Sequence, residues 1–145
     1  MKKQRICLIG LGYVGLPLAA AFAKKFQVIG FDIDTLRIQE LEDGHDRTLE
    51  IEDDLLASVK NNITYTSNIQ DAKDCDIYIV TVPTPIDKIN HPDLTPLIES
   101  SKTIGTVLSK DDIVIYESTV YPGVTEDVCV PELEKSSGMV FNKDF

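Results

Sequence analysis

The chain has 145 residues, of which 43% are hydrophobic and 26% charged, and its formal net charge is −10 at pH 7. These values fit one globular domain that buries its own core. The acidic balance disfavours nucleic acid and anionic membrane as partners, because both carry negative charge. No apolar run approaches the roughly 20 residues that span a bilayer, and the first apolar run begins too early for a signal peptide. We expect a cytoplasmic protein.

Apolar runs rich in β-branched residues alternate along the chain with stretches of helical spacing. The runs predict strands at 5–10, 27–32, 63–66, 76–82, 112–117 and 139–141. The stretches between them predict helices at 14–25, 35–43 (with Asp34 or Thr35 as the N-cap), 50–60, 94–108 and 124–135, the last interrupted or restarted at Pro131. Strands that are apolar throughout, separated by helices, indicate a doubly wound, mainly parallel α/β sheet with helices on both faces.

Three glycines stand at the junction of the first strand and the first helix. Gly10, Gly12 and Gly15 form a G-x-G-x-x-G pattern in the strand–loop–helix context that dinucleotide binding requires. The first glycine permits a tight turn, the second lets the backbone approach a pyrophosphate, and the third lets the helix pack close to the strand. The pyrophosphate would lie at the positive end of the helix dipole. This pattern predicts a Rossmann-type domain.

An acidic residue completes the pattern. Asp32 ends the second predicted strand, 20 residues after Gly12 (32 − 12), where a carboxylate accepts hydrogen bonds from the ribose hydroxyls of adenosine and repels a 2′-phosphate. We therefore expect NAD rather than NADP, with Arg37 covering the adenine or pairing with Asp32. A glycine-rich turn beside a solvated aspartate is the plainer alternative. FAD and S-adenosylmethionine, which use related loops, are minor alternatives.

The three cysteines and two histidines show no metal-ligand spacing. Cys7, Cys75 and Cys129 are far apart and form no C-x-x-C pair, which argues against a disulfide framework and fits a reducing compartment. His45 and His91 are separated by 46 positions. We expect no metal site, and we interpret the cysteines as packing residues.

Four segments carry a resemblance to a known family: GLGYVGLPLA (10–19), FDID (31–34), VTVPTP (80–85) and YESTVYPGVTE (116–126). In this order and spacing they closely resemble the amino-terminal domain of the UDP-glucose/GDP-mannose dehydrogenases, the nucleotide-sugar 6-dehydrogenases. The resemblance covers essentially the whole chain. Within the family, PTPIDKINHPDLTPL and YESTVYPGVTEDVCVP are most similar to the branch that oxidises UDP-N-acetylhexosamines. Glu117 stands where the UDP-glucose branch usually carries lysine, which supports the same branch.

The resemblance implies a cofactor site and its residues. Gly10 to Gly15 would hold the pyrophosphate of NAD, with backbone N–H groups from Tyr13 and Val14. Asp32 and Arg37 would face the adenosine. Thr84 and Thr119, which follow the fourth and fifth expected strands of the parallel sheet, would lie towards the nicotinamide ribose.

The resemblance also implies a reaction that this chain would not complete alone. The family oxidises the C6 alcohol of a UDP-sugar to a carboxylate with two NAD, through a thioester on an enzyme cysteine. That cysteine, its lysine helper, the central helix and the sugar-nucleotide domain are expected beyond residue 145. Residues 1–145 would then be an NAD-binding domain without a catalytic residue, inactive by itself. The full-length enzyme would be a homodimer or larger, acting on UDP-N-acetylglucosamine or UDP-N-acetylgalactosamine for surface polysaccharide synthesis. The alternative is a stand-alone, non-catalytic module that binds or senses NAD.

Overall fold

A five-stranded, wholly parallel sheet forms the centre of the computed structural model, which describes residues 4–145. Its strand order is β3-β2-β1-β4-β5. Every adjacent pair is parallel, which confirms the doubly wound sheet expected from the sequence. The strands are β1 (Arg5–Ile9), β2 (Gln27–Phe31), β3 (Ile63–Thr66), β4 (Ile77–Val80) and β5 (Ile113–Tyr116).

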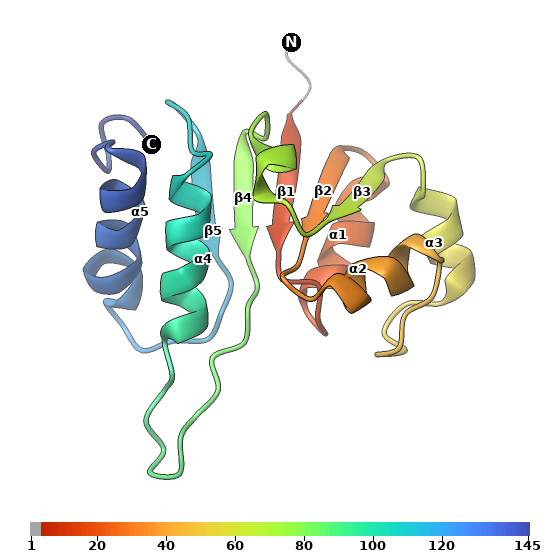
Figure 1. The fold of residues 1–145 in the computed structure, drawn as a ribbon, viewed down its shortest axis with the longest axis horizontal. Coiled ribbons are helices and arrows are strands. Elements are labelled where there is room, and N and C mark those ends of the chain that lie inside the picture. The colour runs from red at the N-terminus through yellow and green to blue at the C-terminus, as the bar shows by residue number, and fades with distance from the viewer. Residues whose placement is uncertain (1–3) are drawn as a thin grey trace.

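Helices cover both faces of this sheet (Figure 1). One face carries the helices between β1 and β3, and the other carries those that follow β3. This arrangement buries most of β1, β2 and β4 on both sides. Ile113 and Ile115 of the edge strand β5 stay exposed. The helical elements are α1 (Gly15–Ala23), α2 (Thr35–Glu42), α3 (Asp53–Val59), the short 3₁₀ turn η1 (Ile69–Ala72), α4 (Thr95–Gly105), the π-helical turn η2 (Thr125–Cys129) and α5 (Val130–Ser137).

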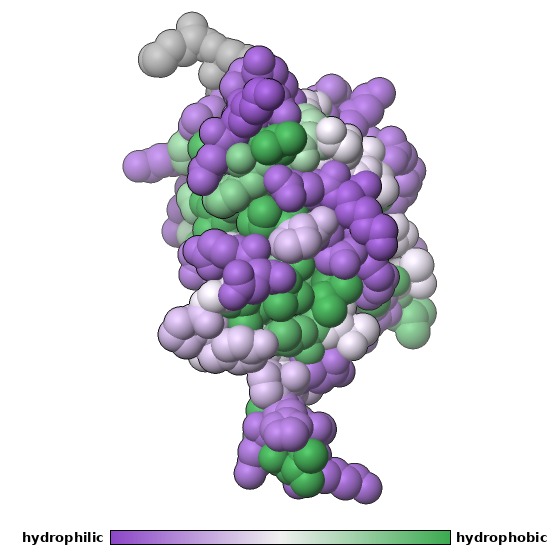
Figure 2. All heavy atoms as spheres, turned by 90° about the vertical axis from the view of Figure 1, so that its left-hand side faces the viewer, coloured by the Kyte–Doolittle hydropathy of each residue, from purple (hydrophilic) through white to green (hydrophobic). Residues whose placement is uncertain are grey.

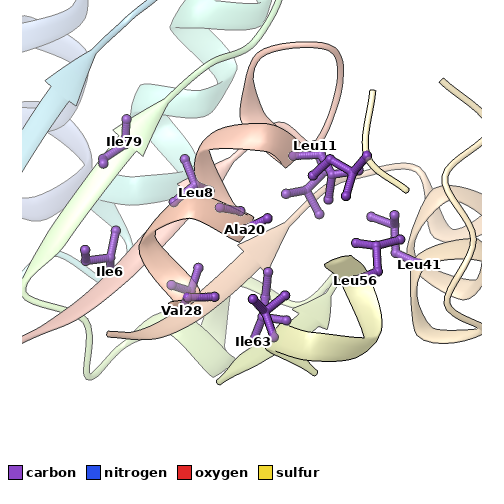
Figure 3. Packing of buried hydrophobic residues seen from close by; sticks show 14 of the residues in the cluster. Ile6, Leu8, Leu11, Ala20, Val28, Leu41, Leu56, Ile63 and Ile79 are labelled. Carbon is purple, nitrogen blue, oxygen red and sulfur yellow. The ribbon is translucent and has the colours of Figure 1, made fainter. Parts of the chain in front are cut away.

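The alternation of side chains along β1 divides the core into two clusters. Ile6 and Leu8 point to the face of α1, α2 and α3, whereas Cys7 and Ile9 point to the face of α4 and α5. Figure 3 shows the first cluster, to which Leu11 from the loop after β1 also belongs. The loop that carries the glycine pattern is thereby anchored in the hydrophobic core.

The chain after α5 differs from the expected last strand. Residues 139–141 are not a strand: Gly138 ends α5 in the left-handed conformation (φ +74°), and a turn follows. The backbone N–H of Val140 donates to Asp144 Oδ2, and that of Phe141 donates to Glu134 Oε1. These local acceptors occupy N–H groups that a sheet partner would need. The change of helix type before Pro131 was anticipated, because proline has no N–H to continue the α-helical ladder.

The carboxyl ends of all five strands lie at one edge of the sheet, because the strands are parallel. At this edge β1 lies between β2 and β4, and the helices that follow these two strands pack on opposite faces of the sheet. The position beside β1 is therefore the topological switch point, where α/β proteins bind ligands. The loop between β4 and α4 projects from the same edge (Figures 1 and 2) and is closed by an antiparallel bridge between Ile86 and Pro92. Within residues 4–145, no helix combines the length and apolar character that membrane crossing requires.

Candidate functional site

The loop between β1 and α1 is built around two glycines that no other residue could replace. Gly10 has φ +95°. Its N–H donates to the carbonyl of Phe31 at 2.9 Å, so the start of the loop is hydrogen-bonded to the end of β2. A Cβ on Gly15 would lie 1.7 Å from the Gly10 carbonyl oxygen and 2.5 Å from Thr81 Oγ1. Helix α1 therefore starts directly against the end of β1, as the glycine pattern predicts.

The middle glycine serves a different purpose. A Cβ on Gly12 would meet no atom within 4 Å, so the fold itself does not exclude a side chain there. The neighbouring Tyr13 and Val14 have exposed side chains. The space above Gly12 is therefore open to a ligand, and a side chain at this position would fill it.

The backbone N–H groups at the start of α1 have no hydrogen-bond partner among the described residues. Within the described residues 4–145, we find no hydrogen-bond acceptor for the backbone N–H groups of Gly12, Tyr13, Val14 and Gly15. Such groups, together with the helix dipole, bind phosphate. The chemistry of the loop therefore fits the pyrophosphate of a dinucleotide.

Asp32 lies directly after β2, beside the same loop. Its Oδ2 accepts the N–H of Leu11 at 2.9 Å, and its Oδ1 accepts the N–H of Asp34 at 2.9 Å. Each carboxylate oxygen has two lone pairs, so the group can still accept hydrogen bonds from ribose hydroxyls. The structure thus places Asp32 against the glycine loop, and its contact with a ribose stays a prediction.

Arg37 lies beneath the loop and not on its open side. Its side chain is 3% exposed, and its Nε donates to the carbonyl of Leu11 at 2.9 Å. Its Nη1 donates to Glu40 Oε1 at 2.8 Å, and its Nη2 lies 2.8 Å from Asp46 Oδ1. The last contact lacks hydrogen-bond geometry, so we describe it as an ion pair. No direct pair joins Arg37 to Asp32 among the described residues, and contact of this guanidinium with adenosine stays a prediction.

The N-terminus of α2 holds a second basic residue near Asp32. Asp34 caps the helix by accepting the N–H groups of Leu36 and Arg37, and is thus the N-cap of the two candidates, Asp34 and Thr35, that the sequence offered. Its Oδ2 also accepts from Arg47 Nη2 at 2.9 Å. The bond from Arg47 and the two backbone bonds lower the pKa of Asp34. Asp34 is therefore ionised at neutral pH, and its charge is balanced by the guanidinium of Arg47.

A pocket of about 340 Å³ joins the glycine loop to the neighbouring helix α4. Gly10 and Asp32 line one side of it, and its other walls are mostly apolar, with Phe31, Ile33 and Pro96. A flat aromatic group such as adenine fits such walls. Among the predicted residues, the structure brings Gly10 and Asp32 together here. Three larger hollows lie elsewhere among the described residues: one of 610 Å³ beside α2 and α3, one of 420 Å³ along residues 45–54, and one of 660 Å³ at the opposite end of the sheet.

Thr84 and Thr119 are in contact after the ends of β4 and β5. The Oγ1 of Thr84 donates to the backbone carbonyl of Thr119 at 2.9 Å. A parallel bond runs from Ser118 Oγ to the carbonyl of Val82 at 2.6 Å. The two threonines thus lie together at the carboxyl edge of the sheet, and their contact with a nicotinamide ribose stays a prediction.

Three residues that shape the site were not recognised from the sequence. Thr81 Oγ1 donates to the carbonyl of Gly10 at 2.8 Å, Leu11 is held by Asp32 and Arg37, and Asp46 is buried behind Arg37. The only sequence signal for Thr81 was its place directly after a strand. The only signal for Leu11 was its apolar side chain between two glycines. Asp46 gave no signal, because its burial behind Arg37 depends on tertiary packing.

Comparison with known proteins agrees with this geometry. Residues 4–145 match the family model described as UDP-glucose/GDP-mannose dehydrogenase family, NAD binding domain. The chain is 57% identical over its whole length to UDP-N-acetyl-D-glucosamine 6-dehydrogenase of Pseudomonas aeruginosa, and 55% identical over 97% of its length to that of Salmonella typhi. It spans about a third of each relative, 34% and 33% respectively.

Solved structures show the same fold. UDP-D-ManNAc dehydrogenase of Pyrococcus horikoshii superposes with a TM-score of 0.91 at 34% identity, covering 98% of this chain and 34% of that one. GDP-mannose dehydrogenase of Pseudomonas aeruginosa gives a TM-score of 0.88 at 28% identity, covering 94% and 33%. The Rossmann-type fold and the NAD cofactor expected from the sequence are confirmed. The chain belongs to the UDP-glucose/GDP-mannose dehydrogenase family, of which it carries the NAD binding domain.

Proposed function

We propose that this chain is the cofactor-binding part of a UDP-N-acetylhexosamine 6-dehydrogenase. The observation that carries the proposal is the difference in sequence identity between two groups of relatives. Identity is 57% and 55% to two UDP-N-acetyl-D-glucosamine 6-dehydrogenases, but 37% to UDP-N-acetyl-D-mannosamine dehydrogenase of Campylobacter jejuni. UDP-N-acetylglucosamine is accordingly the preferred substrate of the full-length enzyme, with UDP-N-acetylgalactosamine as the second.

In this proposal the residues at the carboxyl edge of the sheet bind and orient NAD. The open N–H groups of Gly12 to Gly15 hold the pyrophosphate, Asp32 accepts the adenosine ribose hydroxyls, and Thr84 with Thr119 lies towards the nicotinamide ribose. Bound NAD supplies a hydride acceptor. The glycine loop, Asp32 and the two threonines would hold the nicotinamide of NAD in a fixed position relative to the sugar-binding part of the enzyme.

The wider setting is part of the same proposal. Oxidation of a C6 alcohol to a carboxylate removes four electrons and thus consumes two NAD, and the product would serve surface polysaccharide synthesis. The three buried, unpaired thiols support a reducing compartment, the cytoplasm. The full-length enzyme would be a homodimer or a larger assembly, which light scattering on that protein tests.

The experiment is a substrate panel with the full-length protein and NAD. We expect NADH formation with UDP-N-acetylglucosamine or UDP-N-acetylgalactosamine at two NADH per sugar, and much slower turnover with UDP-glucose. The 145-residue chain assayed in parallel should bind NAD and form no NADH. Retained NAD binding without turnover of any UDP-sugar by the full-length protein would overturn the proposal and favour a non-catalytic NAD-binding module.

A further inference from the structure

We propose that Asp46 is a positioning residue for the NAD-binding loop, acting on it through Arg37. Asp46 is 1% exposed and lies behind Arg37, so it has no surface to offer a ligand. Its effect on the cofactor would pass through the backbone of Leu11, between the first two glycines of the loop. The inference rests on the proposed placement of NAD at this loop.

The side chain, the N–H and the carbonyl of Leu11 are all held in place. Its side chain is fully buried, and it lies next to Gly30 of β2, where a Cβ would come within 3.2 Å of its methyl groups. Its N–H donates to Asp32, and its carbonyl accepts from Arg37 Nε, each at 2.9 Å. With Leu11 held in this way, the N–H groups that follow it are presented in one arrangement.

Arg37 can hold Leu11 only if its guanidinium is itself held. The side chain is 3% exposed, and a buried guanidinium is costly unless it is paired. Glu40 binds Nη1 and Asp46 lies against Nη2, so the two carboxylates fix two corners of the planar group. The remaining donor, Nε, is thereby directed at the carbonyl of Leu11.

Asp46 is in turn fixed by the segment that follows it. Its Oδ1 accepts the N–H of Thr48 at 3.0 Å and the hydroxyl of Thr48 at 2.6 Å. Its Oδ2 accepts the N–H groups of Glu50 and Ile51 at 3.0 and 3.1 Å. The carboxylate therefore cannot rotate away from Arg37. A rigid chain of contacts runs from residues 46–51 through Arg37 to the glycine loop.

The test compares two variants of the same carboxylate cluster. Asp46→Asn removes the charge that faces Arg37, whereas Thr48→Val removes only the hydroxyl bond on the other side of Asp46. NAD affinity is measured by calorimetry, and the free energy of unfolding by urea denaturation. Amide hydrogen exchange of Leu11 is measured on the chain without NAD. Arg37→Lys, which keeps the charge but loses the fork that reaches both Leu11 and Asp46, replaces Asp46→Asn if that variant does not fold.

We expect Asp46→Asn to weaken NAD binding about tenfold, because binding must then also order the loop. We also expect this variant to speed hydrogen exchange of the Leu11 amide. Thr48→Val should lower stability yet leave both NAD affinity and Leu11 exchange at the wild-type value, because three backbone N–H groups still hold the Asp46 carboxylate in place. Equal losses of NAD affinity in the two variants at matched stability would show a merely structural role and overturn the inference. Unchanged Leu11 exchange in Asp46→Asn would also overturn it. Absence of NAD binding by the wild-type chain would instead refute the proposed cofactor site, while the exchange measurement would still decide whether Asp46 orders the loop.

Discussion

The carbonyl oxygen of Gly10 lies 1.7 Å from the position that a Cβ on Gly15 would take. Strand β1 and helix α1 thus meet at a distance that leaves no room for any side chain at residue 15. The same relationship brings the start of α1, with its unpaired N–H groups, directly over the end of the strand. Close packing and the exposure of N–H groups that can bind phosphate are therefore two consequences of one contact.

Replacing Gly15 with alanine should destabilise the fold. The added methyl group overlaps the backbone of Gly10 and the hydroxyl of Thr81, so the helix must shift, at a cost of about 3 kcal/mol. Urea denaturation followed by circular dichroism measures this change. An unfolding free energy within about 0.5 kcal/mol of wild type would show that the contact is not needed.

Replacing Gly12 with alanine should separate binding from stability. The fold leaves open space there, so the free energy of unfolding should stay equal or rise by up to about 1 kcal/mol through the smaller entropy of the unfolded chain. NAD affinity should fall, because the methyl group occupies the space in which the pyrophosphate approaches the backbone. Wild-type NAD affinity in Gly12→Ala, measured by calorimetry, would contradict this placement of the phosphates.

The pH dependence of stability should show the contribution of Asp46. Burial by itself raises the pKa of this carboxyl, but bonds from Thr48 and the backbone, together with the ion pair with Arg37, outweigh it and lower the pKa from 3.8 to about 2. A lowered pKa stabilises the folded state above the unfolded value and loses that effect as the pH falls from about 4 to 2. The contribution is about 2 kcal/mol. Urea denaturation at several pH values should show a shallower acid dependence in Asp46→Asn than in wild type, and identical slopes would argue against the assignment.

The three thiols should be unreactive in the folded protein. Cys7, Cys75 and Cys129 are free and buried, at 0%, 3% and 1% exposed. A thiol reagent should modify them only when the chain unfolds, so the rate should rise steeply with urea. Fast labelling of any of them under native conditions would contradict their interpretation as packing residues.

Local patterns predicted the fold well because its elements depend on short-range features. The apolar runs that form β1 and β4, the glycine pattern and the Asp34 cap were all readable from neighbouring residues. Residues 139–141 were wrongly predicted to be a strand, because three apolar residues are β-prone, but the N–H groups of Val140 and Phe141 donate to nearby side chains. The contacts of Arg37 with Leu11 and Asp46 were not predicted for another reason: they are fixed by burial and tertiary packing, which sequence spacing does not show.

The most direct measurement is a calorimetric titration of the 145-residue chain with NAD and NADP at one salt concentration. The open loop and the Asp32 carboxylate beside it predict NAD binding at least about tenfold tighter than NADP, because a 2′-phosphate would be placed against that carboxylate. Asp32→Ser should reduce this preference. Equal affinity for the two cofactors, or no binding of either, would contradict the assignment of the glycine loop and Asp32 as the cofactor site.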